Sequence, residues 1–208
     1  MNAVVKLERH DAIGIVTVDS PPVNALSAAV RGGIFDCMKE AIADPAIKAI
    51  VLTCGGRTFI AGADITEFGK PPKPPGLQEA LVLMENSPKP IVAAIHGTAL
   101  GGGLEVALAC HYRVAVKEAR LGLPEVKLGL LPGAGGTQRL PRLIGVEGAL
   151  NVMLSGEPLP ATLFAKTPLV DKLVEKDTRA AAIAFAREIA TARKADASKP
   201  LPRARDRR

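Results

Sequence analysis

Apolar residues recur along the chain with two spacings, which predict alternating helices and buried strands. Between Ser27 and Pro45 they fall at i, i+3, i+4, i+7 and i+8, the spacing of one face of an α-helix. That face consists of Ile34, Cys37, Met38, Ala41 and Ile42. Ser27 is a favourable N-cap for this helix. Two nearly continuous apolar runs, at 47–53 and 90–95, are typical of parallel strands buried on both faces.

The rest of the chain repeats this alternation. Residues 4–7 and 12–18 are expected to form a β-hairpin, and 77–85 a short helix. Further helices are expected before Cys110 and, near the C-terminus, on an apolar stripe. The stripe consists of Ala182, Phe185, Ala186, Ile189 and Ala190. Strand, glycine-rich turn and helix therefore recur, which predicts an α/β fold with one domain over 1–193 and a basic linker or disordered tail over 194–208.

Composition narrows the classes of partner. Only 3% of residues are aromatic, which argues against a protein that binds nucleic acid by stacking bases. Most of the net charge of +6 lies in residues 199–208, which carry five cations and one anion. The remaining mild positive balance suits an anionic ligand such as a nucleotide-bearing coenzyme. No signal peptide and no apolar run of membrane-spanning length are recognised, so a cytoplasmic protein without nucleic-acid or membrane partners is expected.

Glu105 stands out because it is the one charged residue in the segment 104–110, which is otherwise apolar all round. A helix that is apolar all round is buried, and burial of an unpaired carboxylate is costly and raises its pKa. One interpretation is a catalytic acid or base. The other is a residue that turns back to cap the first turn of its own helix, where the helix dipole favours negative charge.

Gly101, Gly102 and Gly103 directly precede this helix. Three glycines at a strand-to-helix junction allow a ligand to approach the backbone, and they leave unpaired N–H groups at the helix N-terminus. Such donors can form an oxyanion site. A tight turn that needs small residues is the alternative interpretation.

Two further segments add chemistry. The loop 59–65 has small residues that can offer another backbone donor, although Asp64 by itself reads as a turn or capping residue. Glu125 lies among apolar neighbours, so two carboxylates in apolar settings form a candidate acid/base pair. Nucleophile-elbow, P-loop and dinucleotide motifs are missing from the sequence, and the three histidines lack metal-ligand spacing from the cysteines. No metal site is expected.

Taken in order, these motifs resemble the crotonase (enoyl-CoA hydratase/isomerase) superfamily over about residues 4–173. The matching stretches are Phe59-Ile-Ala-Gly-Ala-Asp-Ile65, Lys89-Pro-Ile-Val-Ala-Ala-Ile-His-Gly97, Ala99-Leu-Gly-Gly-Gly-Leu-Glu105, Leu123-Pro-Glu125 and Pro132-Gly-Ala-Gly-Gly-Thr-Gln-Arg139. The last three, found in this order, are highly specific.

The resemblance implies a role for each matching residue. It implies catalytic glutamates at Glu105 and Glu125, and an oxyanion hole formed by the N–H groups of Ala63 and Gly102. Coenzyme A is implied along Ala61, Gly62, Ala63, Asp64 and Ile65. It enters as part of the substrate thioester, and no tightly bound cofactor is implied.

The resemblance further implies a spiral of ββα turns with surrounding helices, in a homotrimer or a dimer of trimers. The implied reaction is hydration of trans-2-enoyl-CoA to 3-hydroxyacyl-CoA in fatty-acid β-oxidation. Double-bond isomerisation of 3-enoyl-CoA, other crotonase-type chemistry and a catalytically idle acyl-CoA-binding module stay open as alternatives.

The C-terminus departs from the family pattern. Members of the family continue into C-terminal helices that cover the acyl pocket. We expect this C-terminal helical region to be largely absent from this sequence. Residues 199–206 resemble the segment that joins the hydratase half to the dehydrogenase half in multifunctional fatty-acid oxidation enzymes. The resemblance therefore implies the N-terminal hydratase part of such an enzyme.

Overall fold

The computed structural model describes residues 4–71, 73–196 and 200–207, and the strands found there form two sheets. The strands are β1 (Val5–His10), β2 (Ile13–Val18), β3 (Ala49–Cys54), β4 (Ile91–Ile95), β5 (Thr98–Leu100), β6 (Tyr112–Val116), β7 (Arg120–Gly122), β8 (Leu159–Pro160) and β9 (Lys172–Val174). The large sheet has the order β1-β2-β3-β4-β6-β9, and the small one has the order β5-β7-β8. The expected hairpin is confirmed as the antiparallel pair β1–β2, and the other pairs in the large sheet are parallel.

Six α-helices and four short 3-10 turns connect these strands in the described residues. The helices are α1 (Ala28–Ala43), α2 (Leu77–Glu85), α3 (Gly102–Ala109), α4 (Gly136–Ile144), α5 (Val146–Ser155) and α6 (Thr178–Ala195). The turns are η1 (Ile65–Glu67), η2 (Pro124–Leu128), η3 (Ala161–Phe164) and η4 (Ala204–Asp206). The Ser27 cap is confirmed, because its hydroxyl accepts a hydrogen bond from the Val30 N–H at 3.3 Å.

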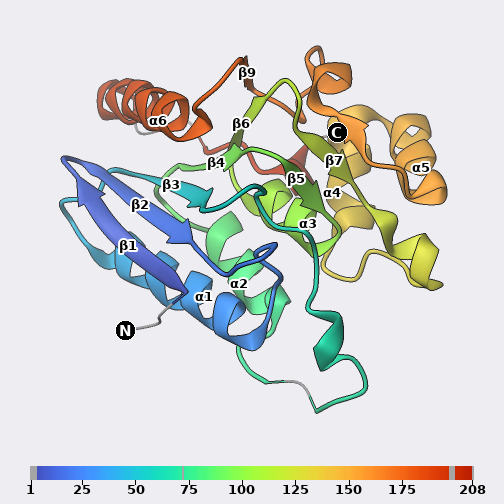
Figure 1. Cartoon of the computed structure of the whole chain (residues 1–208). Helices are drawn as coiled ribbons and strands as arrows, with labels where there is room; N and C mark the ends of the chain where they lie inside the picture. The colour runs from blue at the N-terminus through green and yellow to red at the C-terminus, as the bar shows by residue number, and fades with distance from the viewer. Residues whose placement is uncertain (1–3, 72, 197–199, 208) are drawn as a thin grey trace.

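The central strands of the large sheet are covered on both faces, which explains their nearly continuous apolar runs. In β3, Ile50 and Leu52 face the core shared with α1, α2 and α3, whereas Ala49 and Val51 face α6. Because successive side chains of a strand point to opposite faces, a strand covered on both sides has few polar positions. Figure 1 shows α6 on one side of this sheet, with α1 and α2 on the other.

The chain spirals between the two sheets. It passes from β4 in the large sheet to β5 in the small sheet and then into α3. It repeats the step from β6 to β7 before it reaches η2. The α/β prediction is confirmed, and each passage brings a turn to the same end of the molecule.

Gly103 is required by packing where α3 crosses the loop before it. A Cβ built on this residue would lie 2.1 Å from the carbonyl oxygen of Ile60, a contact with backbone that cannot rotate away. We expect Gly103→Ala to destabilise the fold by about 3 kcal/mol. For a chain of this size that corresponds to a thermal midpoint lower by roughly 6–12 °C, measurable by calorimetry. Gly148→Ala in α5 is the matched control, because its nearest contacts are ordinary at 3.6 Å. Equal midpoints for the two variants would contradict the expectation.

Residues 200–207 lie against the domain. Ala204 in η4 is buried, and η4 packs next to α4. Arg205 donates to the side-chain oxygen of Asn86 at 2.8 Å. The division into a domain over 1–193 and a linker or tail over 194–208 stays a prediction, and residues 197–199 and 208 lie outside the described part of the chain. No helix in the described ranges is long and apolar enough to cross a membrane.

Candidate active site

The glycine turn before α3 supplies a helix N-terminus with free donors. Gly101 has φ +52°, a left-handed conformation that favours glycine, and it turns the chain from β5 into the helix. Gly102 is the first helical residue, and all eight residues of α3 are buried. The first N–H groups of α3 therefore lie at the N-terminus of a fully buried helix.

Ala63 and Gly102 lie next to each other, as the oxyanion interpretation requires. The Leu26 N–H donates to the Gly62 carbonyl at 2.9 Å, and this short bridge fixes the backbone at Ala63. A Cβ built on Gly102 would lie 4.0 Å from the Ala63 nitrogen. In the described part of the chain, no hydrogen bond uses the N–H of either Ala63 or Gly102. Two neighbouring, unused backbone donors are the arrangement that stabilises negative charge on a carbonyl oxygen.

Glu105 is buried, with 2% of its surface exposed, but it does not cap its own helix. Its Oε1 accepts hydrogen bonds from the N–H groups of Ala134 at 2.7 Å and Gly136 at 2.8 Å. Ala134 lies in the loop before α4 and Gly136 is the first residue of α4, so both donors lie far along the chain from Glu105. Burial raises the pKa of Glu105 above its usual range, although the two N–H donors and the charge of Arg139 oppose the shift.

Glu125 reaches the same glycine turn from η2. A Cβ built on Gly101 would lie 3.3 Å from Glu125 Oε1. Glu125 Oε2 is shielded from solvent and has no hydrogen-bond partner among the described residues. Burial raises the pKa of Glu125, and the negative charge of Glu105 raises it further. The structure thus brings both glutamates to one site.

The loop expected to contact coenzyme A borders these donors. Asp64 caps η1 by accepting from the Thr66 N–H at 3.0 Å, so its interpretation as a capping residue is confirmed. Ala63 and Ile65 are exposed, and Ala61 is half-buried. Glu67, within η1, pairs with Arg31 of α1 at 2.9 Å and so ties the loop to that helix. The loop therefore offers an accessible surface beside Gly102.

Sequence reasoning assigned no role to two buried charges beside the site. Arg139 of α4 pairs with Glu85 of α2 through two hydrogen bonds of 3.0 Å each. Arg139 Nη1 also donates to the Ala134 carbonyl at 2.8 Å. One signal was available, because Glu85 follows Leu77 by eight positions and so falls on the apolar face of its helix.

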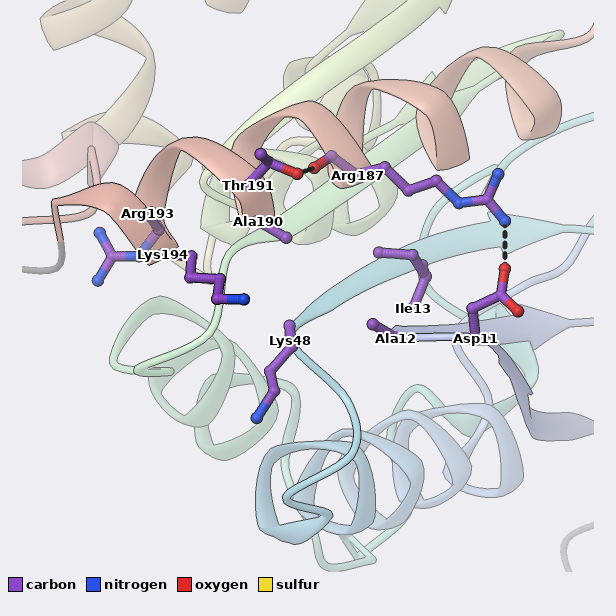
Figure 2. A pocket seen from close by; sticks show the side chains of 9 residues that line it. All are labelled: Asp11, Ala12, Ile13, Lys48, Arg187, Ala190, Thr191, Arg193 and Lys194. Atoms are coloured by element: carbon purple, nitrogen blue, oxygen red, sulfur yellow. Dashed lines mark hydrogen bonds and ion pairs between the residues drawn. The ribbon is translucent and has the colours of Figure 1, made fainter.

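A cavity of about 750 Å³ lies elsewhere, between α6 and the start of β2 (Figure 2). Arg187 of α6 and Asp11 of the hairpin turn form an ion pair of 2.8 Å at one side of it. Lys48 and Lys194 line the other side. None of the expected site residues lines this cavity, so the chemistry of the glutamates is separate from it.

Comparison with known proteins decides the family. A family model described as enoyl-CoA hydratase/isomerase matches residues 8–201. The chain belongs to this family. The resemblance to the crotonase superfamily and the α/β fold that it implied are confirmed.

Named relatives cover different shares of their own length. The chain is 49% identical over 175 residues to the peroxisomal bifunctional enzyme of Danio rerio, a match covering 84% of this chain and 24% of that protein. It is 45% identical over 166 residues to a probable enoyl-CoA hydratase of Bacillus subtilis (strain 168), covering 76% of this chain and 64% of that one. The chain therefore spans about a quarter of the length of the bifunctional relative.

Solved structures share the fold. Pseudomonas aeruginosa DspI superposes with a TM-score of 0.84 at 34% identity, covering 91% of this chain and 81% of that chain. The enoyl-CoA hydratase from Mycobacterium tuberculosis H37Rv gives a TM-score of 0.83 at 38% identity, covering 89% and 75%. This family member thus has the fold of solved enoyl-CoA hydratases over most of its length.

Proposed function

We propose that the chain hydrates trans-2-enoyl-CoA to 3-hydroxyacyl-CoA, with Glu105 and Glu125 as the catalytic pair. One observation supports the proposal most directly. Two carboxyl groups with raised pKa, Glu105 and Glu125, lie beside a glycine turn where two backbone N–H donors have no partner among the described residues. The unpartnered Glu125 Oε2 is an acceptor suited to a water molecule. The family described as enoyl-CoA hydratase/isomerase supports this class of chemistry.

The mechanism follows from where charge develops. The thioester carbonyl oxygen accepts hydrogen bonds from the N–H groups of Ala63 and Gly102, which stabilise the enolate-like charge of the transition state. Glu105 takes a proton from the water whose oxygen bonds to the β-carbon. Glu125, protonated at the start of the step, holds that water and delivers its own proton to the α-carbon. Glu105 then releases its proton and Glu125 regains one from solvent, so the net change adds the elements of one water across the double bond, from one side, without a tightly bound cofactor.

Coenzyme A is proposed to lie along Ala61, Gly62, Ala63, Asp64 and Ile65. The exposed backbone and side chains of this loop border the donors that would hold the thioester. The coenzyme then arrives as part of the substrate, and its phosphates suit the positive balance of the chain. Participation in fatty-acid β-oxidation and a cytoplasmic location are further parts of the proposal, although several relatives carry peroxisomal names.

Assembly into a homotrimer or a dimer of trimers, which the family resemblance implies, is also proposed, and an uncovered apolar surface supports association in general. Val146, Leu150 and Leu154 recur every four residues on α5, and each exposes 45% or more of its surface. An apolar helix face of this kind marks a site of association. Sedimentation measures the mass directly, and a monomer would contradict the assembly.

The test is the fate of crotonyl-CoA and of a 3-enoyl-CoA in the presence of the chain. Hydration is followed as loss of enoyl-thioester absorbance, with the 3-hydroxyacyl product identified by mass. Conversion of 3-enoyl to 2-enoyl thioester alone would favour an isomerase. Binding of coenzyme A with neither reaction would leave a catalytically idle module and overturn the proposal.

The pH dependence of hydration is a separate prediction. Glu105 accepts a proton only when ionised, and burial raises its pKa. On the acid side, activity is therefore expected to be lost as pH falls through a midpoint above about 4.3, the ordinary value for glutamic acid, whereas loss of the Glu125 proton limits activity at high pH. Stopped-flow rates across pH, with the fold monitored by circular dichroism, measure this midpoint. A midpoint at or below the ordinary value would contradict the assigned base.

A further inference from the structure

The ion pair between Arg139 and Glu85 is buried in the wall of the site. Arg139 exposes 5% of its surface and Glu85 exposes 1%. The guanidinium meets the carboxylate through Nε–Oε1 and Nη2–Oε2, each at 3.0 Å. A bidentate pair of this kind fixes the plane of the guanidinium as well as its position. Arg205 adds a second cation at 3.4 Å from Glu85 Oε2.

The remaining Arg139 donor reaches the loop that binds Glu105. Arg139 Nη1 donates to the Ala134 carbonyl at 2.8 Å, and the Ala134 N–H donates to Glu105 Oε1 at 2.7 Å. One residue of the loop is thus held by arginine on one side and by the carboxylate on the other. Gly135 has φ +98°, and a Cβ there would lie 2.2 Å from Arg139 Nη1. The loop therefore leaves a space that the guanidinium fills.

We propose that Arg139 is a positioning residue for Glu105 and that Glu85 holds Arg139 in this role. The inference rests on the proposed function of Glu105. Arg139 does not touch the glutamate; it fixes the backbone whose N–H groups, at Ala134 and Gly136, orient the carboxylate. Without Arg139 the loop loses the contact that fixes Ala134, and Glu105 loses a fixed direction toward the water.

Electrostatics gives this role a measurable signature. The charged groups that act on Glu105 are Arg139 on α4 and Glu125 on η2, together with the two N–H dipoles. Burial opposes the ionised form of Glu105, whereas the dipoles and Arg139 favour it, and the charge of Glu105 in turn raises the pKa of Glu125. Removal of Arg139 is therefore expected to raise the pKa of Glu105 further. Loss of the Arg139 charge contributes to this shift by itself, so a variant that keeps the charge but loses the contact with Ala134 is needed to isolate the positioning role.

The test uses the double variant Glu85→Leu/Arg139→Leu, which replaces the buried pair with apolar side chains and leaves no lone charge in the core. We expect kcat for crotonyl-CoA to fall by between about 10-fold and about 100-fold with little change in KM. The acid limb of the pH profile should move to higher pH. Arg142→Leu is the matched control on the same helix, because Arg142 is exposed and its side chain bonds only Gln138 among the residues that the structure describes. It should leave rate and profile as in the parent.

A second variant, Arg139→Lys, and a second measurement, infrared titration of Glu105, complete the test. Arg139→Lys retains the charge but cannot bond Glu85 and Ala134 together. Its kcat should therefore fall, and the acid limb of its pH profile should move to higher pH, as in the double variant. Infrared titration of the carboxyl band, assigned by subtraction of Glu105→Gln, follows the pKa of Glu105 without any turnover. If the parent lacks hydratase activity, the proposed function fails, and the titration still decides this inference. Folded variants with the parent rate, or with the parent carboxyl titration where the parent is inactive, would overturn it.

Discussion

Glu105→Gln is expected to lower kcat for hydration of crotonyl-CoA by about 10³-fold, within the range that general-base catalysis contributes. Glutamine has nearly the same shape, and its carbonyl oxygen can still accept from the N–H groups of Ala134 and Gly136, now at 2.7 and 2.8 Å from the carboxylate. The fold and the loop should therefore persist. What disappears is a group that can take the proton of the attacking water.

The measurement is loss of enoyl-thioester absorbance, with coenzyme A binding followed by calorimetry. Glu40→Gln on the exposed face of α1 is the matched control and should retain the parent rate. Glu125→Gln should likewise abolish hydration with coenzyme A binding nearly intact. Parallel loss of binding and turnover in Glu125→Gln would mean that Glu125 is structural. Full activity in Glu105→Gln would remove Glu105 from the mechanism.

Gly102→Pro is expected to reduce kcat by about 10²- to 10³-fold, the usual effect of removing one oxyanion donor. Proline lacks the N–H, and its ring occupies the place of that hydrogen. The first helical position tolerates proline well, because its N–H has no partner within the helix. The loss should therefore fall on the reaction more than on α3.

The control for this variant is Gly102→Ala, which keeps the N–H. A Cβ at Gly102 would lie 2.8 Å from Leu26 Cδ1 and 3.2 Å from Leu77 Cδ2, the ends of two flexible side chains. Both variants share this crowding at Cβ, so the ratio of their rates reports replacement of the N–H by the proline ring. Equal rates in Gly102→Ala and Gly102→Pro would show that the Gly102 N–H stabilises no developing charge.

The elements predicted from sequence are those with a strong local signal. α1 has a capping serine and a full apolar face, and β3 and β4 are continuous apolar runs that the large sheet buries on both sides. Boundaries were less accurate, since the strand expected at 47–53 is Ala49–Cys54. The end of a strand depends on the register with its neighbours, which apolar content does not encode.

The small sheet lay beyond sequence reasoning. Its strands β5, β7 and β8 have two or three residues each, too few for a periodic pattern. Their hydrogen-bond partners lie more than 20 residues away along the chain, as in the pairing of Thr98 with Arg120. α5 was not predicted either, because only Gly145 separates it from α4 and no side chain caps its first turn.

The sequence by itself determined which residues are candidates for catalysis. An isolated carboxylate in an apolar helix behind three glycines implies a buried Glu105 at a helix N-terminus, since those properties are local. The tertiary structure alone decided where that carboxylate points and what holds it. Its partners at Ala134 and Gly136 lie 29 and 31 residues away, and Arg139 and Glu85 are 54 residues apart. Contacts across such separations arise from packing of the whole fold, so only the folded chain shows that two glutamates and two backbone donors share one site.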